Sequence, residues 1–328
     1  MSAPLLTVDN LSISFPGERN RRTRVVDRVG FSISAGETLA LVGESGCGKS
    51  MTALAIMRLV PKPGTIEAGS AIHFEGRDLL SLSVPQMRSV RGARIGMIFQ
   101  EPQTSLNPVT TVGDQVTEAI RLHTPISSGE ARKSVVELFA QVGIPDPASR
   151  FEAYPHQLSG GLKQRIMIAM AMALRPRLLI ADEPTTALDA TIRAQILELL
   201  RNLSATTGTA VLLITHDFGV VNEVADRVAV MYAGQIVEEG TRSELLARPH
   251  HPYAQCLLRS IPRPEARGHR LEEIKGGVPR PGHWPGGCRF HPRCPLAFEP
   301  CPTQEPVRTA VSPSHAARCH LVAREAGA

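Results

Sequence analysis

Uninterrupted apolar runs of strand length recur along the first three quarters of the chain. The clearest of them are "ETLALVG" (37–43), "RLLIADE" (177–183) and "TAVLLITH" (209–216). Continuous apolar runs, in contrast to alternating ones, are typical of strands in a parallel sheet that is covered on both faces. The three runs therefore predict buried strands of a parallel sheet.

A helical pattern separates the last two of these runs. Between residues 191 and 208, apolar residues recur on one helical face, namely Ile192, Ile196, Leu200 and Leu203. Gly208 is placed to end this helix, because glycine is favoured just beyond a helix C-terminus. A strand, a helix and a second strand in this order predict an α/β fold.

Residues 105–175 depart from this alternation and look helical. The segment "EARKSVVELFAQVG" (130–143) has a helical pattern, and the proline-containing stretch "IPDPASR" (144–150) follows it as a loop. We interpret this region as a helical subdomain inserted into an α/β domain that covers residues 1–248.

The composition changes after about Pro249. Residues 251–328 contain 12 of the 26 prolines of the chain, and their 11 basic and 6 acidic residues leave a net charge of +5. That excess equals the net charge of the whole chain. Because proline interrupts helices and sheet ladders, we expect no long helix or strand in an extension that covers residues 249–328.

Length and hydropathy limit the class of protein. A chain of 328 residues suggests about two domains. The longest apolar run, "IMIAMAMAL" (166–174), is too short for a membrane span of about 20 residues and predicts a buried core helix. No basic segment followed by an apolar one opens the chain, so we expect a cytosolic protein with reduced thiols.

A glycine-rich loop directly follows the first of these strands. "GESGCGKS" (43–50) fits the phosphate-binding pattern G-x-x-x-x-G-K-[ST] and opens the helical stretch "SMTALAIMRLV". Backbone N–H groups of such a loop surround phosphate oxygens, while Lys49 is expected to reach the β- and γ-phosphates and Ser50 to bind Mg²⁺. The expected nucleotide-binding residues here are Gly43, Glu44, Ser45, Gly46, Cys47, Gly48, Lys49, Ser50 and Met51. Cys47 is interpreted as a small filler residue rather than a reactive thiol.

Two acids end the second strand. Asp182 is placed to act through Mg²⁺, and Glu183 to polarise the attacking water. Phosphoryl transfer depends mainly on positioning and charge stabilisation, which makes one metal-directed and one water-directed carboxylate a sensible division of roles.

A second candidate phosphate cradle occurs in "LSGGLKQR" (158–165). Ser159, Gly160 and Gly161 precede an apolar helix, and a helix N-terminus attracts anions. One nucleotide does not need two such cradles from one chain. Two chains that meet head to tail do need them, because each chain then offers one cradle to the nucleotide of the other.

With these motifs the chain resembles the ATP-binding subunits of ABC transporters, whose signature is similar to LSGGQ, with Leu162 here in place of Gln. The other family elements follow in order: "MIFQEP" supplies Gln100, "ALDA" supplies Asp189 and "LLITHD" supplies His216. The resemblance implies that Gln100 contacts Mg²⁺ and the attacking water, that His216 contacts the γ-phosphate and that Asp189 links two composite sites. Phe15, in "LSISFPGE" (11–18), matches the position of an adenine-stacking aromatic residue or is plain core.

Three stretches resemble the dipeptide/oligopeptide importer subfamily, namely "FQEPQTSLNP" (99–108), "YPHQLSGG" (154–161) and "HPYAQCLL" (251–258). The resemblance implies a motor for peptide import on the cytoplasmic face of the inner membrane, and relatives that carry nickel or other small solutes share much of it. The implied partners are a second homologous ATP-binding subunit, two membrane permease subunits and an extracellular solute-binding protein.

Four of the six cysteines lie near the end of the chain, at positions 288, 294, 301 and 319. Disulfides are disfavoured in a reducing compartment, and the spacing is wider than the pairs that are usual for structural zinc. The resemblance implies a [4Fe–4S] cluster held by Cys288, Cys294, Cys301 and Cys319, while zinc and unligated thiols stay open. His291, His315 and His320 are spare candidate ligands, and Cys256 is interpreted as a buried small residue.

Two rival functions stay open. The first is a soluble ABC ATPase that acts on nucleic acid or ribosomes, although the tail has no dense Lys/Arg cluster and, after Tyr253, only Trp284, Phe290 and Phe298 as aromatic residues. The second is a regulatory ABC subunit that binds ATP without turnover, against which Glu183 and His216 argue. The expectation is a peptide-importer ATPase with no nucleic-acid partner.

Overall fold

The structure is a computed structural model that describes residues 3–17, 21–101, 105–186, 188–260 and 274–326. The chain forms two compact units. The first contains Met1–Ser34, Thr38–Leu80 and Ile214–Ala328, and the second contains Ala35–Glu37 and Ser81–Leu213. The segment after residue 248 therefore lies in the same unit as the glycine-rich loop.

An antiparallel sheet begins the first unit. Its strands run in the order β2–β1–β5–β6, and β4 also pairs with β1. Their bounds are β1 Leu6–Pro16, β2 Arg22–Ile33, β4 Thr65–Ile66, β5 Ala71–Phe74 and β6 Arg77–Asp78. The buried face of β1 carries Leu6, Leu11 and Ile13, none of which has exposed surface.

A second set of paired strands in this unit has the order β12–β13–β11–β10–β3. The bounds are β3 Thr38–Val42, β10 Arg227–Tyr232, β11 Gln235–Thr241, β12 Arg308–Ala310 and β13 Ala316–Arg318. Strand β3 is parallel to β10, and β11 returns antiparallel to β10. In the extension, β13 pairs antiparallel with β11 through Glu238↔Ala317 and Glu239↔Ala316. The extension thus continues the sheet of the first unit.

The helices of the first unit are short. They are α1 Lys49–Ile56, α9 Phe218–Val224, α10 Arg242–Ala247, α11 Pro252–Arg259, the 3-10 turn η4 His291–Arg293 and α12 His320–Ala326. The described elements after residue 248 are all short, as their proline content predicts.

Three aromatic rings form the centre of this core. Tyr232 from β10, Tyr253 from α11 and Phe290 from the cysteine-rich segment are almost completely buried. Their ring centroids lie 4.6 Å apart for Tyr232 and Tyr253 and 5.2 Å apart for Tyr232 and Phe290. The extension therefore shares the core of the unit, although no pattern in its sequence predicted this packing. Such long-range packing leaves no local signal in a proline-rich segment.

The second unit contains the strands β7 Ile95–Ile98 and β8 Leu178–Asp182, which pair in parallel, and most of β9 Ala210–Thr215. The predicted strands at 177–183 and 209–216 are thereby confirmed. Helix α8 (Ala190–Thr207) joins them and ends at Gly208, whose φ of 68° is left-handed, as predicted for its C-terminus.

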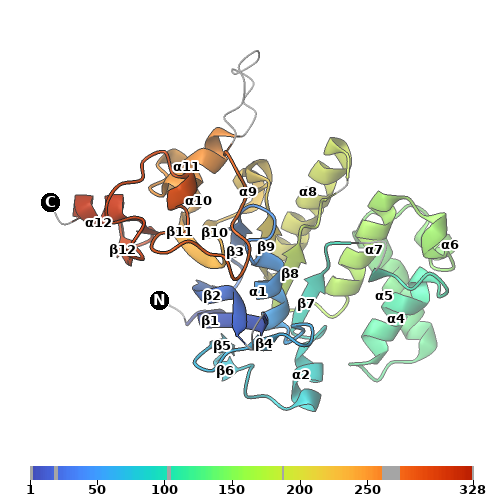
Figure 1. The fold of residues 1–328 in the computed structure, drawn as a ribbon. Coiled ribbons are helices and arrows are strands. Elements are labelled where there is room, and N and C mark those ends of the chain that lie inside the picture. Colours follow the sequence, from blue (N-terminus) through green and yellow to red (C-terminus); the bar gives the residue numbers. More distant parts are fainter. Residues whose placement is uncertain (1–2, 18–20, 102–104, 187, 261–273, 327–328) are drawn as a thin grey trace. The chain divides into compact units, whose positions relative to one another are not determined.

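A group of helices completes the second unit, and Figure 1 shows α4, α5 and α7 packed together. The bounds are α2 Val84–Val90, α4 Val112–Arg121, α5 Ser128–Gln141, α6 Pro147–Arg150, the 3-10 turn η2 Pro155–Gln157 and α7 Gly160–Met172. The apolar run at 166–174 lies largely in α7, and its side chains are mostly buried, which confirms a core helix. Among the described residues, no helix combines the length and the hydropathy that a membrane span requires.

Candidate nucleotide site and cysteine cavity

The glycine-rich loop connects β3 to α1. A Cβ atom on Gly43 would lie 2.2 Å from the carbonyl oxygen of Met231. Gly48 has a φ of 110°, and a Cβ atom there would lie 3.0 Å from the carbonyl oxygen of Val25. Two of the glycines that the motif requires are thus fixed by close backbone approach, and the loop packs directly on the neighbouring strands.

Lys49 is the first residue of α1 and is only 5% exposed. Its ammonium group donates hydrogen bonds to the carbonyl oxygens of Gly43, at 2.8 Å, and Glu44, at 3.1 Å. A cation within the loop and the N-terminus of α1 both favour a bound anion. Cys47 has no exposed surface, and burial raises the pKa of its thiol, which favours the small-residue interpretation.

Glu44, inside the loop, contacts two residues of the extension. Its backbone N–H donates to Tyr253 Oη at 2.9 Å. Its carboxylate accepts from both terminal nitrogens of Arg293, at 2.7 Å to Oε2 and 2.9 Å to Oε1. The sequence reasoning gave Tyr253 and Arg293 no role, since a contact across 209 or 249 residues leaves no local pattern.

In the second unit, Asp182 ends β8 and is 4% exposed. Glu183 follows with a φ of 47°, a left-handed conformation that is uncommon for non-glycine residues. Its Oε2 atom accepts hydrogen bonds from Gln100 Nε2, at 3.2 Å, and from Thr186 Oγ1, at 2.8 Å. The two predicted residues Gln100 and Glu183 are thus brought together, and Thr186 joins them without having been predicted.

The signature motif caps a helix. The hydroxyl of Ser159 accepts a hydrogen bond from Leu162 N at 3.4 Å, and Ser159 and Gly160 are exposed. Asp189 caps α8 in the same way, because its Oδ1 atom accepts from Ile192 N at 2.9 Å. A Cβ atom on Gly161 would lie 3.0 Å from Ile192 Cγ2, so the starts of α7 and α8 pack closely. Both helix N-termini leave exposed surface for another molecule.

The remaining predicted residues of the nucleotide site lie in the first unit. His216 follows β9 and is exposed. Phe15 lies on β1, is half-buried and packs against Gly64, where a Cβ atom would lie 2.5 Å from the ring. Residues 102–104 of the extended Gln100 loop and Ala187 lie outside the described residues.

The donor chemistry of the predicted magnesium ligands fits the ion. Ser50 offers a hydroxyl, Gln100 an amide oxygen and Asp182 a carboxylate, and oxygen atoms are the ligands that Mg²⁺ prefers in proteins.

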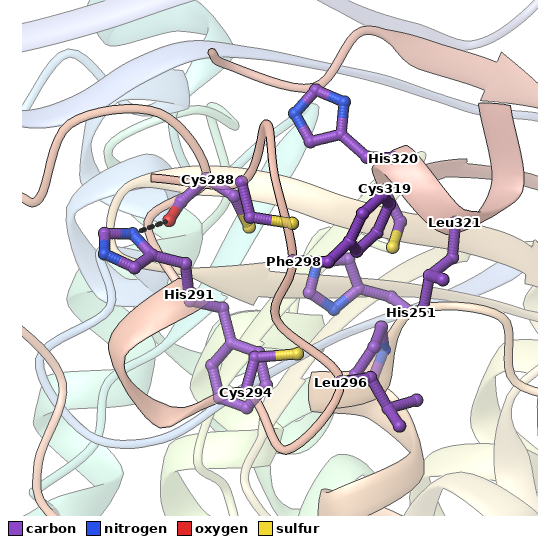
Figure 2. A pocket seen from close by; sticks show the side chains of 12 residues that line it. His251, Cys288, His291, Cys294, Leu296, Phe298, Cys319, His320 and Leu321 are labelled. Carbon is purple, nitrogen blue, oxygen red and sulfur yellow. Dashed lines mark hydrogen bonds between the residues drawn. The ribbon is translucent and has the colours of Figure 1, made fainter. Parts of the chain in front are cut away.

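Four cysteines of the extension line one small cavity (Figure 2). They are Cys288, Cys294, Cys301 and Cys319. The sulfur atoms of Cys288, Cys294 and Cys319 face the same space in Figure 2. Burial raises the pKa of Cys288 to about 11 and that of Cys294 to about 11. Four thiols around one cavity are the usual donor set of a [4Fe–4S] cluster.

The spare histidines are all engaged in hydrogen bonds. His291 donates to the Cys288 carbonyl at 2.9 Å, and His320 donates to the Gln304 carbonyl at 2.9 Å. His315 Nε2 lies 2.7 Å from the buried Glu238 Oε1. Within the described ranges, no three His, Cys, Asp or Glu side chains are placed to hold a single metal ion. Cys256 lies on α11, half-buried against the aromatic core, and does not line the cavity.

Comparison with known proteins identifies both parts of the chain. Residues 26–186 match the family described as "ABC transporter", and residues 237–301 match "Oligopeptide/dipeptide transporter, C-terminal region". The chain is 52% identical to the probable peptide ABC transporter ATP-binding protein y4tR of Sinorhizobium fredii, covering 96% of this chain and 94% of the relative.

Two further relatives match over almost their full length. The dipeptide transport ATP-binding protein DppD of Escherichia coli is 48% identical, with 98% of each chain covered. The oligopeptide transport ATP-binding protein AppD of Bacillus subtilis is 49% identical, also with 98% of each chain covered.

Solved structures agree with the fold. The dimeric ATP-binding cassette MJ0796 bound to ADP and Pi is 26% identical, with a TM-score of 0.65, and 98% of it matches 72% of this chain. The cbiO1 protein of Clostridium perfringens is 27% identical, with a TM-score of 0.63, and 92% of it matches 75% of this chain. On its sequence identity across nearly the whole length and on its fold, the chain belongs to the ATP-binding proteins of ABC transporters, in the oligopeptide/dipeptide transporter family.

Proposed function

We propose that this chain binds and hydrolyses ATP to power the import of dipeptides or oligopeptides. The observation that carries the proposal is the contact between Gln100 and Glu183 beyond two adjacent parallel strands, in a chain half identical to peptide-transport ATP-binding proteins. Phosphoryl transfer needs a carboxylate oriented towards water, and a hydrogen-bonded Glu183 meets that need.

The phosphate loop holds the nucleotide in this proposal. The N–H groups from Gly43 to Met51 surround the phosphates, and Lys49 turns from its two carbonyl partners to the β- and γ-phosphates. Ser50, Gln100 and Asp182 would hold Mg²⁺, which would neutralise charge on the phosphates.

The other proposed roles concern the attacking water, the γ-phosphate and the adenine ring. Glu183 accepts a proton from the attacking water, Gln100 orients that water and His216 contacts the γ-phosphate. Phe15 stacks on adenine. The exposed positions of Gln100 and His216 are compatible with direct contact to nucleotide.

A second ATP-binding subunit completes each site in this proposal. Ser159, Gly160 and Gly161 contact the nucleotide of the partner, and Asp189 links the two sites. The exposed N-terminus of α7 and its packing against the start of α8 support this arrangement. The MJ0796 cassette is dimeric. We propose a homologous but different subunit as the partner here.

We further propose a peripheral position on the cytoplasmic face of the inner membrane, where two permease subunits dock on the ATPase pair. An extracellular solute-binding protein delivers the peptide. The names of DppD and AppD, as dipeptide and oligopeptide transport ATP-binding proteins, support this assignment.

We propose that the cysteine cavity holds a [4Fe–4S] cluster. The four cysteines line one space, and a cluster has its four iron atoms spread apart, so its ligands need not converge on one point. Zinc needs four donors around a single ion, and within the described residues no such group occurs. The cluster therefore agrees with the arrangement of the thiols better than zinc does.

The test is reconstitution of this chain with its second ATPase subunit and two permease subunits in liposomes. We expect ATP hydrolysis to rise when a solute-binding protein loaded with a dipeptide is added, and labelled dipeptide to accumulate. If only a nickel-loaded binding protein stimulated ATP hydrolysis, the transported solute would be nickel instead of peptide. Stimulation by RNA or ribosomes without membrane subunits would overturn the transport function.

A further inference from the structure

Resting on the nucleotide site proposed above, we propose that Arg293 and Tyr253 of the extension are positioning residues for the phosphate loop. They act through Glu44 and never touch the reacting atoms. The extension then sets the geometry in which the loop receives phosphate, and it links the cysteine cavity to nucleotide affinity.

Three of the groups of Glu44 have partners. Its N–H donates to Tyr253, its carboxylate accepts two hydrogen bonds from Arg293, and its carbonyl accepts from Lys49. A bidentate pair between a guanidinium and a carboxylate fixes direction as well as distance. The first residue after Gly43 is therefore held from the side of the extension.

Arg293 is itself held firmly. Its side chain is 7% exposed, and its Nε and Nη2 atoms donate to the carbonyl oxygens of Lys275, at 2.9 Å, and Gly276, at 3.3 Å. The guanidinium lies 5.8 Å from the ring centre of Tyr232, which is part of the buried aromatic core. Such an arginine cannot follow a moving carboxylate, so it restrains the loop.

Tyr253 gives the second restraint. It has no exposed surface, its N–H donates to His251 Nδ1 at the start of α11, and its ring packs against Phe290. Burial raises the pKa of its phenol. The hydroxyl thus remains a neutral acceptor for the N–H of Glu44.

The restraint reaches the phosphate-binding lysine. Lys49 bonds the carbonyls of Gly43 and Glu44, so a displaced Glu44 peptide changes the resting position of the ammonium group. It also changes the directions of the N–H groups that follow in the loop. Positioned donors bind an anion more strongly than donors that must first be ordered.

The cysteine cavity adjoins this restraint. Arg293 directly precedes Cys294, whose side chain lines the cavity together with Phe290. The 3-10 turn that carries Arg293 runs from His291 to Arg293 and leads into Cys294. Rearrangement of that turn moves the partner of Glu44.

The test measures MgADP binding by calorimetry on the full chain, because ADP is not consumed, together with KM and kcat for ATP. We expect Arg293→Ala and Glu44→Gln each to raise the Kd about tenfold, the range of a lost charge-assisted hydrogen bond. Arg293→Lys keeps the charge without the fork and gives a smaller rise, and Tyr253→Phe raises Kd about threefold. KM follows Kd, while for Arg293→Ala and Tyr253→Phe kcat at saturating ATP stays within about twofold.

A double-mutant cycle separates positioning from general damage. If Arg293 acts through Glu44, the double variant Arg293→Ala/Glu44→Gln has a Kd for MgADP no higher than that of the single variant with the higher Kd. Arg289→Ala is the matched control, because Arg289 is 11% exposed in the same segment and pairs with Asp27, outside the loop. We expect this control to unfold at a lower temperature with its Kd unchanged.

Each outcome decides between the hypotheses. Equal weakening by Arg289→Ala, or additive effects of Arg293→Ala and Glu44→Gln, would overturn the inference in favour of general destabilisation. Unchanged binding in Arg293→Lys, Glu44→Gln and Tyr253→Phe would also overturn it. Failure of the unmodified chain to bind MgADP would instead overturn the proposed nucleotide function.

Discussion

Gln100 Nε2 donates a hydrogen bond to Glu183 Oε2 at 3.2 Å. The two residues are 83 positions apart, and each follows one of the adjacent parallel strands β7 and β8. Carboxyl ends of parallel strands meet at one edge of a sheet, which is where α/β proteins place their ligands. Two side chains with proposed roles in hydrolysis are therefore in direct contact.

Replacement of Glu183 by Gln is expected to abolish turnover while ATP stays bound. The amide retains the size of the side chain but accepts no proton from water, so kcat should fall by at least about a hundredfold. Phosphate release measures kcat, and filter retention of labelled ATP measures binding. Glu198→Gln, an exposed change on α8, is the control and should hydrolyse ATP normally. Undiminished hydrolysis by the Glu183 variant would remove the proposed role.

Two variants of Asp189 can distinguish its role as a helix cap from its proposed role between subunits. Asp189→Ala removes the acceptor of the Ile192 N–H and should cost about 1 kcal/mol of stability. Asp189→Asn keeps a good cap but loses the charge. We expect Asn to restore the unfolding temperature without restoring ATPase activity of the assembled transporter. Full activity of the Asn variant would leave Asp189 with a capping role only.

The cysteine cavity predicts metal content. Anaerobically purified protein should contain about four iron and four sulfide per chain, as a [4Fe–4S] cluster requires. Cys319→Ser should lower both, because one of the four ligands is lost. Cys256→Ser is the matched control, since Cys256 lies outside the cavity in the same extension, and should keep both. Zinc in place of iron would favour the alternative cofactor.

The low pKa of Glu244 predicts that acid weakens the attachment of the hairpin formed by β12 and β13. Hydrogen bonds from Thr241, Ser312 and Ser314 lower the pKa of its carboxyl group from 4.5 to about 2. Folding therefore favours the charged form, and this contribution is present above pH 4.5 and lost as the pH falls towards 2. The variant Ser312→Ala/Ser314→Ala should lose less stability on acidification, measured by thermal unfolding at several pH values. Equal pH dependence in both proteins would contradict the assignment.

Local signals predicted much of the fold. The apolar runs at 177–183 and 209–216 became strands because a covered parallel sheet accepts only such runs. Gly208 ended its helix because a left-handed residue was required there. The phosphate loop was visible because its glycines, Lys49 and Ser50 stand at the short, fixed spacing of a known phosphate-binding pattern.

Contacts between residues far apart in the sequence could not be predicted from local signals. No periodicity indicated that Ala316 and Ala317 pair with β11, or that Phe290 packs on Tyr232. No motif assigned a role to Arg293, yet its guanidinium binds Glu44 within the loop. A single arginine beside a cysteine carries no pattern from which its partner could be inferred.

By itself, the sequence determined the kind of chemistry, because phosphate binding and metal-directed carboxylates need particular residues at short, fixed spacings. The tertiary structure alone decided which of those residues have partners. Gln100 meets Glu183 through strand pairing, and Arg293 meets Glu44 through packing of the extension on the rest of the first unit. Both contacts depend on how distant segments pack. The free energy of packing is shared among many residues, so no single residue in the sequence indicates it.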